Sequence, residues 1–477
     1  IQSDDKILVS GWNPDVTVFS VSRFNADGSK DLSFGTNGTS SHFIGNGSDF
    51  SPDIALQSDG KIIQSGFCRN DFGNWCFALV RYTQDGDLDH TFSGDGIVLT
   101  SFNAVTNDDL SSGVAVQPDD KIIQVGTDFD SAGGQSCEIV RFNANGSLDN
   151  SFGINGKVIT TIGNPYPHAT CVAVKNNGKI VVGGYSESVS VAPTCFTLMQ
   201  FEPSGNLDPQ FGNNGKVTTY FGAGGSSGVD YESSQSFDVG IQPDGKIVLA
   251  GYSNLGSNPY IQIAISRYNV DGSLDNTFGN NGKVLIANEN FGYSTLGIFI
   301  QGDSKIITSG GGGATNYEFI LSRFNVDGSL DSTFGNAGMA NTIIDSTFAR
   351  ASAVNMQSDG KLIAAGYTDN DCKVVRYTSG IEVGINPIGT NNIQTELFPN
   401  PVHFNATIKY DLPQNDHLTM ILKDMLGNTA QTFMAGENKN AGLHIENLEI
   451  DHSLSAGAYF LEIHGRNTFK LLKLIVQ

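Results

Sequence analysis

The sequence predicts an all-β protein made of a seven-bladed β-propeller followed by a small immunoglobulin-like β-sandwich. The prediction depends on two phrases, of the forms "QSDGKIIQSG" and "RYNVDGSLDNTFGNNG", that recur in alternation, and on a change of sequence character near residue 380. Self-similarity at a fixed period indicates a stacked or circular repeat architecture. The lysines of the seven copies of the first phrase are Lys6, Lys61, Lys121, Lys179, Lys246, Lys305 and Lys361.

Each repeat contains four strand-length runs. In the third repeat these runs are 113–117, 121–126, 138–143 and 156–162, and they are rich in Val and Ile. Apolar alternation over such lengths predicts strands, and the "PDD", "SDG" or "PDG" between the first two predicts a hairpin turn. Four short antiparallel strands repeated seven times are typical of a propeller. A solenoid is the alternative, although solenoid repeats are usually shorter and more uniform.

The repeat array is incomplete at both ends. The first repeat lacks most of its first strand, and the seventh stops at 374–380, before its fourth strand. The first residues read as the middle of a repeat, so we expect further sequence upstream of Ile1. Because a closed ring is normally completed by pairing strands from the two chain ends, we predict that one blade is incomplete in this chain.

Composition excludes several classes of protein. A hydrophobic content of 39% with 57 glycines indicates a packed, turn-rich β protein rather than a disordered chain. The net charge of −22 and the lack of a basic run argue against nucleic acid, which needs clustered Lys and Arg, and favour solubility. No run approaches the roughly 18–20 apolar residues of a membrane span, so no transmembrane segment is predicted.

The second phrase is interpreted as a structural loop. The segment 267–275 partly matches calcium loops of the form D-x-D-x-D-G-x-x-D, but Arg267 stands at the first position, where a guanidinium offers Ca²⁺ no oxygen. We expect Arg267 itself to be the cation and to pair with Asp275. Calcium is the less favoured alternative, and no other cofactor is expected. The same pairing is predicted in two further copies, Arg141 with Asp149 and Arg323 with Asp331.

Binding residues are expected on one face of the ring. The first-to-second and third-to-fourth connections are the repeated phrases, whereas the other two connections vary, so the variable loops share the opposite face. Aromatic and polar side chains in these loops suit sugars or peptide segments, although they are also ordinary loop residues. The candidates are Trp12, Trp75, Tyr166, Tyr231, Tyr260, Tyr317 and Asp371.

Catalytic signatures are weak. "GGSSG" (224–228) formally matches G-x-S-x-G through Ser226, but it lacks the strand–turn–helix context of a nucleophile, so no catalytic residue is assigned. Carboxylates from different blades could still converge in space. Cys68 and Cys76 flank a short loop, where a disulfide in an oxidising compartment and buried free thiols are both open interpretations.

The two phrases, "DGKI…G" and "RF/RY-N-x-DG-x-LD-x-x-FG-x-x-G", resemble the delta-60 repeat family of secreted bacterial proteins over roughly residues 1–380. The resemblance implies a propeller-like fold and little about function. We expect a propeller over 1–378, a linker over 379–395 that is rich in Gly, Asn and Thr, and a C-terminal sandwich over 396–477. Alternating runs at 406–412, 418–425, 458–465 and 469–477 predict strands of that sandwich.

The C-terminal segment resembles the type A sorting domain of the type IX secretion system of Bacteroidota. The residues that carry the resemblance are Pro399, Asn400, Pro401, Asp424, Gly427, Gly457, Tyr459, Lys470 and Lys473. The resemblance implies handling by the secretion machinery, transport across the outer membrane, removal of the tail and often attachment to surface lipopolysaccharide. "SLSAGAY" departs from the family, which often has Pro before the glycine. An ordinary adhesive sandwich is the alternative.

These observations favour a secreted or cell-surface protein that binds glycan or protein without catalysis. The alternative from another class is a secreted polysaccharide hydrolase or lyase that uses carboxylates on the variable face. A purely structural surface repeat is the third hypothesis. A central acidic cluster with strongly perturbed pKa values would favour the enzyme, and an aromatic face without such shifts would favour binding.

Overall fold

The structure, a computed structural model, describes the chain in segments: residues 1–12, 18–45, 49–102, 108–129, 134–163, 166–187, 193–222, 233–255, 260–287, 292–312, 318–344, 348–368, 372–378, 395–423, 429–455, 457–465 and 469–476. The chain divides into two units, Ile1–Gly384 and Ile385–Gln477. No helix that could cross a membrane occurs in these segments.

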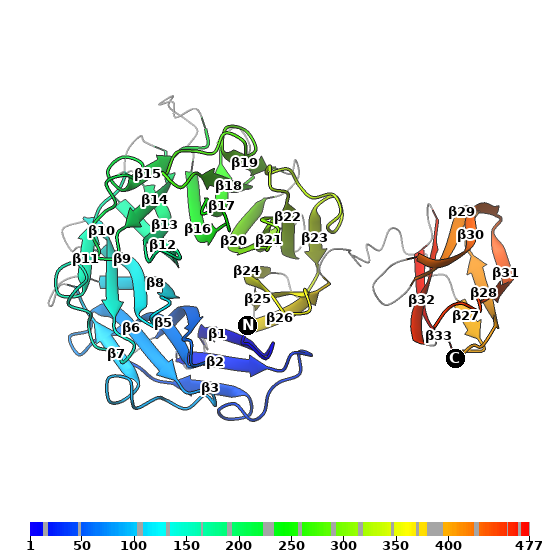
Figure 1. Ribbon diagram of the computed structural model, residues 1–477, viewed down its shortest axis with the longest axis horizontal. Coiled ribbons are helices and arrows are strands. Elements are labelled where there is room, and N and C mark those ends of the chain that lie inside the picture. Colours follow the sequence, from blue (N-terminus) through cyan, green and yellow to red (C-terminus); the bar gives the residue numbers. More distant parts are fainter. Residues whose placement is uncertain are drawn as a thin grey trace. The chain divides into compact units, whose positions relative to one another are not determined.

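The first unit is a ring of seven antiparallel sheets, and the first strand of each four-stranded sheet lies nearest the centre (Figure 1). Blade 1 has β1 (Ile7–Trp12), β2 (Phe19–Phe24) and β3 (Thr39–His42). Blade 2 has β4 (Phe50–Leu56), β5 (Ile62–Arg69), β6 (Trp75–Tyr82) and β7 (Ile97–Thr100). Blade 3 has β8 (Asp108–Val116), β9 (Ile122–Phe129), β10 (Gln135–Phe142) and β11 (Lys157–Thr160).

Blade 4 has β12 (Tyr166–Val174), β13 (Ile180–Glu187), β14 (Cys195–Phe201) and β15 (Lys216–Thr219). Blade 5 has β16 (Ser233–Ile241), β17 (Ile247–Asn254), β18 (Gln262–Tyr268) and β19 (Lys283–Ile286). Blade 6 has β20 (Tyr293–Ile300), β21 (Ile306–Gly312), β22 (Glu318–Phe324) and β23 (Met339–Thr342). Blade 7 has β24 (Ala349–Met356), β25 (Leu362–Thr368) and β26 (Cys372–Tyr377).

The seven predicted blades are confirmed, but the prediction of one incomplete blade is corrected. Within the described residues two sheets have three strands, β1–β2–β3 and β24–β25–β26. Among these residues, blade 1 has no strand inside β1, and blade 7 has no strand outside β26. The missing strand is the inner one in blade 1 and the outer one in blade 7. One missing strand therefore cannot explain both three-stranded sheets.

The apolar core lies between blades rather than within them. Residues of β9 and β10 pack against residues of β13 and β14, for example Val125 and Ile139 against Val182 and Met199. Comparable clusters fill the seams between blades 1 and 2, 2 and 3, 4 and 5, 5 and 6, and 6 and 7. Each blade is therefore stabilised by its neighbours, because burial of apolar surface is the main favourable contribution to folding.

The second repeated phrase forms the polar joint between neighbouring blades. Arg267 at the end of β18 is 2% exposed, and its Nε lies 2.8 Å from Asp275 Oδ2. Its guanidinium stacks 4.4 Å from the centre of the Phe278 ring and donates through Nη1 to the carbonyl of Val326 in blade 6. The loop thus holds its own aspartate and at the same time contacts the next blade.

The Asp-Gly glycine of the phrase is also needed where neighbouring blades meet, because the backbone there leaves no room for a side chain. Gly328 has φ +88°, a region that disfavours other residues, and a Cβ there would lie 2.9 Å from the Phe278 ring of the preceding blade. The amide of Gly279 donates to the carbonyl of Asp327 at 2.7 Å across the same joint. The corresponding Arg–Asp distances are 2.8 Å for Arg141 with Asp149 and for Arg323 with Asp331.

Blade 4 changes the joint and keeps a positive charge in it. Gln200 stands where the other full copies have arginine, and its Nε2 donates to Asp208 at 2.7 Å. Lys175, which replaces the glutamine of the "IQPDGKI" phrase, lies with its Nζ 5.8 Å from the centre of the Phe211 ring. The cation over the phenylalanine therefore comes from the neighbouring hairpin instead of from the third strand.

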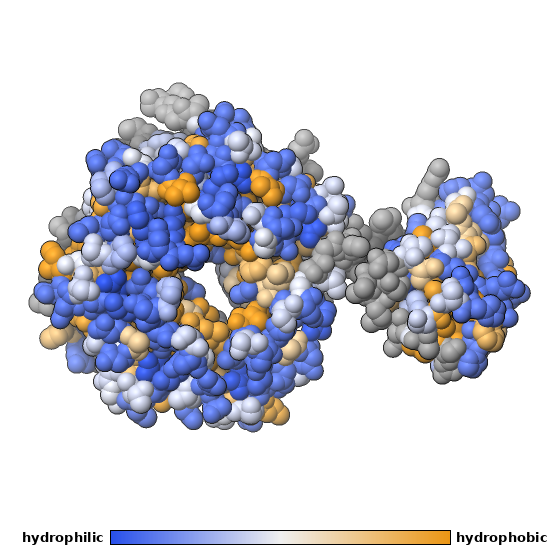
Figure 2. All heavy atoms as spheres, viewed as in Figure 1, coloured by the Kyte–Doolittle hydropathy of each residue, from blue (hydrophilic) through white to orange (hydrophobic). Residues whose placement is uncertain are grey.

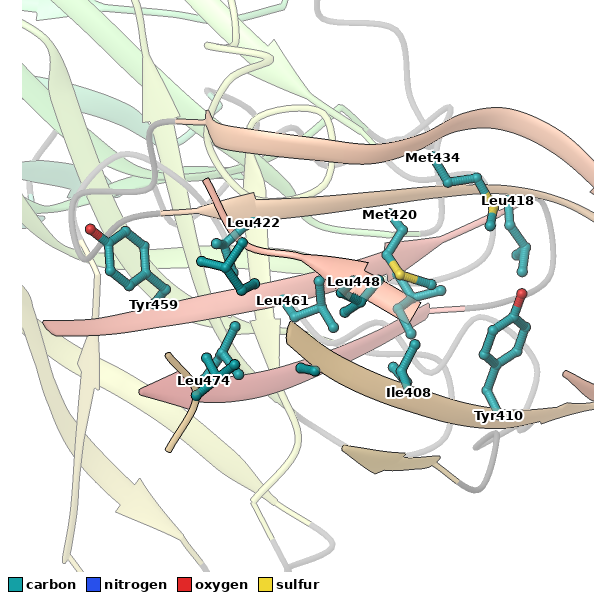
Figure 3. Packing of buried hydrophobic residues seen from close by; sticks show 14 of the residues in the cluster. Ile408, Tyr410, Leu418, Met420, Leu422, Met434, Leu448, Tyr459, Leu461 and Leu474 are labelled. Atoms are coloured by element: carbon teal, nitrogen blue, oxygen red, sulfur yellow. The ribbon is translucent and has the colours of Figure 1, made fainter. Parts of the chain in front are cut away.

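The second unit is a two-sheet sandwich. One sheet contains β27 (Thr395–Phe398), β28 (Asn405–Leu412) and β31 (Gly442–Glu449). The other contains β30 (Thr429–Lys439), β29 (Asp416–Lys423), β32 (Gly457–His464) and β33 (Phe469–Val476). Ile408 and Tyr410 of β28 meet Met420 and Leu461 of the opposite sheet in the buried core (Figure 3).

Candidate functional site

Several of the predicted binding residues lie outside the described part of the chain. These are Tyr231, Tyr317 and Asp371, together with Asp424 and Gly427 of the sorting motif. Trp12 ends β1, but its side chain is not described. The predicted roles of these residues, in binding or in sorting, therefore stay predictions.

Trp75 packs into a local aromatic cluster instead of forming an open platform. Its ring lies 5.6 Å from Phe50 and 5.3 Å from Phe67, and the Arg69 guanidinium lies over it at 4.2 Å. Tyr166 begins β12 in blade 4 and Tyr260 precedes β18 in blade 5, and both are half-buried. The three residues thus belong to three different blades, and the structure does not gather them into one pocket among the described residues.

A different set of aromatic side chains forms a continuous row across blades 3, 4 and 5. The aromatic row consists of Phe129, His168, Tyr185, Phe237 and Tyr252, all half-buried. Successive ring centres are 6.0, 4.5, 6.4 and 5.6 Å apart. The row follows the innermost two strands near the ends from which the variable loops depart, on the face where binding was predicted.

Polar side chains accompany the aromatic row. Tyr252 donates its hydroxyl to Gln235 Oε1 at 2.8 Å, and Gln235 Nε2 donates to Glu187 Oε1 at 3.2 Å. Burial raises the pKa of Tyr185 above its ordinary value, and the Glu187 charge adds to this effect. Burial also lowers the pKa of His168, although Glu187 opposes the shift. The row therefore combines neutral aromatic faces with an amide and a carboxylate.

The sequence contained a signal for the aromatic row that the loop-based prediction did not use. The glycine that closes the first phrase is followed by an aromatic residue in five of the seven repeats, at Trp12, Phe67, Tyr185, Tyr252 and Tyr367. These positions lie on the second strand and not in a loop, so a search for loop aromatics passes over them. His168 was already present in the variable segment "NPYPH", next to the predicted Tyr166.

Two carboxylates, Asp53 and Asp238, occupy equivalent places on the inner strands of blades 2 and 5. The inner strands surround the opening at the ring centre that Figure 2 shows. Asp53 of β4 accepts from the amides of Ile54 and Val114, both at 2.8 Å. Asp238 of β16 accepts from Val239 at 2.8 Å and Ile298 at 2.7 Å. Each carboxylate thereby joins its own strand to the inner strand of the next blade.

Burial shifts the protonation of these two carboxylates. It raises the pKa of Asp53 to about 6 and that of Asp238 to about 7, even though backbone hydrogen bonds oppose both shifts. Both residues are half-buried. Each is also fully engaged by two backbone donors, which is the arrangement of a structural clamp.

A second group of acids is buried in blade 3. Asp109, Asp128 and Glu138 each contribute a carboxylate oxygen to a cluster whose oxygens all lie within 4.8 Å of one another. Burial raises the pKa of Glu138 to about 10, and the charges of Asp109 and Asp128 contribute further. Burial likewise raises the pKa of Asp109 to about 7, against the hydrogen bond from the Phe102 amide.

Blade 2 carries the cysteine pair. Cys68 and Cys76 face each other across β5 and β6, are both buried, and have their sulfur atoms 3.9 Å apart as free thiols. A cavity of about 410 Å³ lies beside them, bordered by Arg69, Phe72 and Cys76. The structure brings the two sulfurs together, and oxidation to a disulfide stays a prediction.

The sorting-motif residues that are described act within the tail. Asn400 accepts from the Ile475 amide at 2.9 Å, and the next apolar residue, Val402, donates to the Ile475 carbonyl at 2.7 Å. Tyr459 donates to the Ser455 carbonyl at 2.9 Å, and Gly457 begins the same strand. The Pro399–Pro401 segment is thus fastened to β33, on which Lys470 and Lys473 lie.

Comparison with known proteins agrees with this architecture. A family model described as a domain of unknown function (DUF5122) beta-propeller matches residues 2–34, 57–92, 117–152, 175–211, 242–278, 301–334 and 357–380. A second model, described as a secretion system C-terminal sorting domain, matches residues 396–477. Fold and tail together define an exported β-propeller repeat protein.

The chain belongs to this propeller family of unknown function and carries the type IX sorting domain at its C-terminus. The predicted recognition and localisation are therefore confirmed: the protein is exported and is either secreted or attached to the cell surface. No curated protein matches the chain.

Solved structures with similar coordinates are distant. An ulvan lyase, described as a new family of polysaccharide lyase, is 8% identical with a TM-score of 0.39, and the match covers 74% of this chain and 88% of that one. Prolyl oligopeptidase B from Galerina marginata is 11% identical with a TM-score of 0.37, covering 87% and 55%. An arabinanase from Bacillus subtilis is 11% identical with a TM-score of 0.29, covering 56% and 94%. At such TM-scores no activity transfers to this chain.

Proposed function

We propose that the propeller is a non-catalytic binding module that holds a carbohydrate chain against the aromatic row after export. The observation that carries the proposal is the row itself: five half-buried rings in succession across three blades, next to Gln235 and Glu187. Aromatic faces contact the apolar faces of sugar rings, while amides and carboxylates bind hydroxyl groups. The sorting domain agrees with this proposal, because export brings the propeller into contact with extracellular ligands.

The test is a screen of the full chain on bacterial, algal and host glycans, with assay of released sugar at the same spots. Tyr185→Ala should weaken binding about tenfold or more, because it removes the central ring of the row. Tyr367→Ala is the matched control: it removes the aromatic residue at the same repeat position in blade 7, outside the row. Equal loss in both variants, or unchanged binding by Tyr185→Ala, would contradict the proposal.

A second candidate function is a polysaccharide hydrolase or lyase, and the two inner-strand carboxylates with raised pKa values favour it. In that case sugar would be released in the same screen, and Asp238→Asn would abolish release while binding persists. Binding without release supports the first candidate. We favour binding because Asp53 and Asp238 each use both oxygens to accept backbone hydrogen bonds.

A further inference from the structure

Blade 3 contains a carboxylate cluster that the repeat does not require. Asp109 of β8, Asp128 of β9 and Glu138 of β10 are 0%, 6% and 0% exposed. The six other blades serve as an internal comparison, because strand pairing identifies equivalent positions. Glu138 lies opposite the closing glycine, Gly126, and the residues opposite that glycine in four other blades are Ala78, Thr197, Ala264 and Ile320. A blade therefore folds without a carboxylate there.

The buried acid at this position is also unsatisfied. Neither oxygen of Glu138 has a hydrogen-bond partner among the described residues, and the same is true of Asp109 Oδ1. Asp109 Oδ2 accepts from the Phe102 amide at 2.8 Å. An ionised carboxylate without partners is strongly disfavoured in a protein interior, so the cluster is either kept neutral by bound protons or balanced by a bound cation.

The charge of Lys157 acts on Asp109 and Glu138, but among the described residues Lys157 forms no ion pair with either. Lys157 of β11 donates its Nζ to the carbonyl of Ser101 at 2.7 Å. This contact belongs to the repeat, because Lys283 donates in the same way to Tyr220 at 2.8 Å, in blades without such a cluster. Lys157 is thus engaged in joining blades 2 and 3, and Glu138 still lacks a partner.

We propose that Asp109, Asp128 and Glu138 bind a divalent cation of the calcium class. Ca²⁺ prefers carboxylate oxygens at about 2.3–2.6 Å, so oxygens on its opposite sides stand about 4.6–5.2 Å apart. The carboxylate oxygens of the cluster all lie within 4.8 Å of one another, so one ion can contact all three residues. Mg²⁺ usually keeps several waters, which a buried site disfavours. Because the ligands are buried, the cation has a structural role and does not meet a substrate.

The site would connect three strands at the variable face. It joins the start of β8 to the end of β9 and the first half of β10. Phe129, next to Asp128, is the first member of the aromatic row. A bound cation would therefore fix the blade 3 end of that row. The inference stands independently of the proposed function, since cation binding is measured without any glycan.

The experiment is calcium titration of the EDTA-treated full chain by calorimetry. We expect one ion per chain, with Glu138→Gln binding at least about tenfold more weakly, since even the loss of a residue that supports a metal ligand costs about that much. The control is Asp327→Asn, which alters the repeated loop that resembles calcium loops and should bind as the parent does. No binding by the parent, unchanged binding by Glu138→Gln, or loss in Asp327→Asn would overturn the proposal.

A second measurement needs no variant and covers the case in which Glu138→Gln fails to fold. Hydrogen exchange of the parent chain is compared with and without calcium. Slower exchange confined to peptides of β8, β9 and the start of β10 supports the site. Slowing centred on the repeated loops instead, or no slowing anywhere, would overturn it.

Discussion

At the scale of single residues, one aspartate in each joint is bound by several donors. Asp275 Oδ2 meets Arg267 Nε at 2.8 Å and Lys246 Nζ at 3.2 Å, while Oδ1 accepts from the Thr277 hydroxyl at 2.7 Å. Arg267 in turn contacts Phe278 and blade 6, so its charge is held by contacts of different kinds. This concentration of contacts explains why the phrase recurs around the ring.

Blade 4 suggests how the joint can be rebuilt. Arg267→Gln should lower the free energy of unfolding by about 2–4 kcal/mol, because it leaves buried Asp275 with fewer positive partners. Adding Gln242→Lys, which copies Lys175 of blade 4, should restore part of the loss by returning a cation to the joint. Chemical denaturation of both variants and of Gln242→Lys alone gives the interaction free energy between the two substitutions. A double variant no more stable than Arg267→Gln would contradict this.

Protonation of these aspartates should destabilise the ring in acid. Burial favours the neutral form of Asp149, but hydrogen bonds from Ser151 and the charge of Arg141 outweigh it and hold its pKa at about 2, below the ordinary 3.8. A depressed pKa contributes stability that is present above 3.8 and lost as the pH falls toward 2. Asp149→Asn should therefore be less stable than the parent by about 2 kcal/mol at pH 7.

The difference between the two proteins should shrink below pH 4, because the parent then protonates Asp149 itself. Denaturant midpoints of both proteins at pH 7, 4, 3 and 2.5 measure it. The raised pKa values of Asp53 and Asp238 have the opposite effect, because they lower the stability as the pH rises. Both proteins contain these two residues, so their effect cancels in the difference between the parent and Asp149→Asn. A difference that stays constant down to pH 2.5 would show that the joint does not depend on this charge.

At the scale of strands, apolar alternation predicted the middle strands of each blade well and the inner strand less well. The predicted run 113–117 is only the end of β8, which begins at Asp108. The residues before it read "DDLSS", and a register irregularity between Ser111 and Gly113 interrupts the alternation. The same irregularity recurs in β12, β16, β20 and β24, so period-two reasoning fails at each of them.

In the sandwich, β27, β30 and β31 were missed for a related reason. Leu443 and Ile445 of β31 are 67% and 57% exposed, whereas the polar residues that alternate with them, His444 and Glu446, are half-buried. The strand thus runs against the usual burial pattern, and sequence alternation alone does not identify its inner face. The aromatic that follows the closing glycine indicated single members of the aromatic row. The assembly of the row and the blade 3 cluster could not be predicted, because strand pairing and blade order decide which side chains meet.

At the scale of the whole molecule, the seam between blades 7 and 1 is the unusual one. The six other seams contain apolar clusters. Across this seam, Gln357 Nε2 donates to the Asp5 carbonyl at 3.1 Å, Ser358 N donates to Asp5 Oδ1 at 2.7 Å, and Arg376 donates to the Ala26 carbonyl at 2.7 Å. Ring closure therefore relies on polar contacts at the place where both blades are three-stranded.

Blades 2 and 3 provide a matched control for that closure. Gln57 Nε2 donates to the Asp120 carbonyl at 3.0 Å and Ser58 N to Asp120 Oδ1 at 2.7 Å, the same contacts that Asp5 makes. Asp5 and Asp120 also share a φ of 63° and 61°, so alanine causes the same backbone strain at both. Of these two seams, the one between blades 2 and 3 has an apolar cluster among the described residues.

Asp5→Ala should therefore open the ring, whereas Asp120→Ala should act locally. We expect each substitution to cost about 1–2 kcal/mol in lost hydrogen bonds. Hydrogen exchange should then rise along β1, β2, β25 and β26 only in Asp5→Ala, because the described residues form no apolar cluster that would hold blades 1 and 7 together once the polar contacts weaken. Equal and local effects of the two substitutions would mean that residues outside the described segments close the ring.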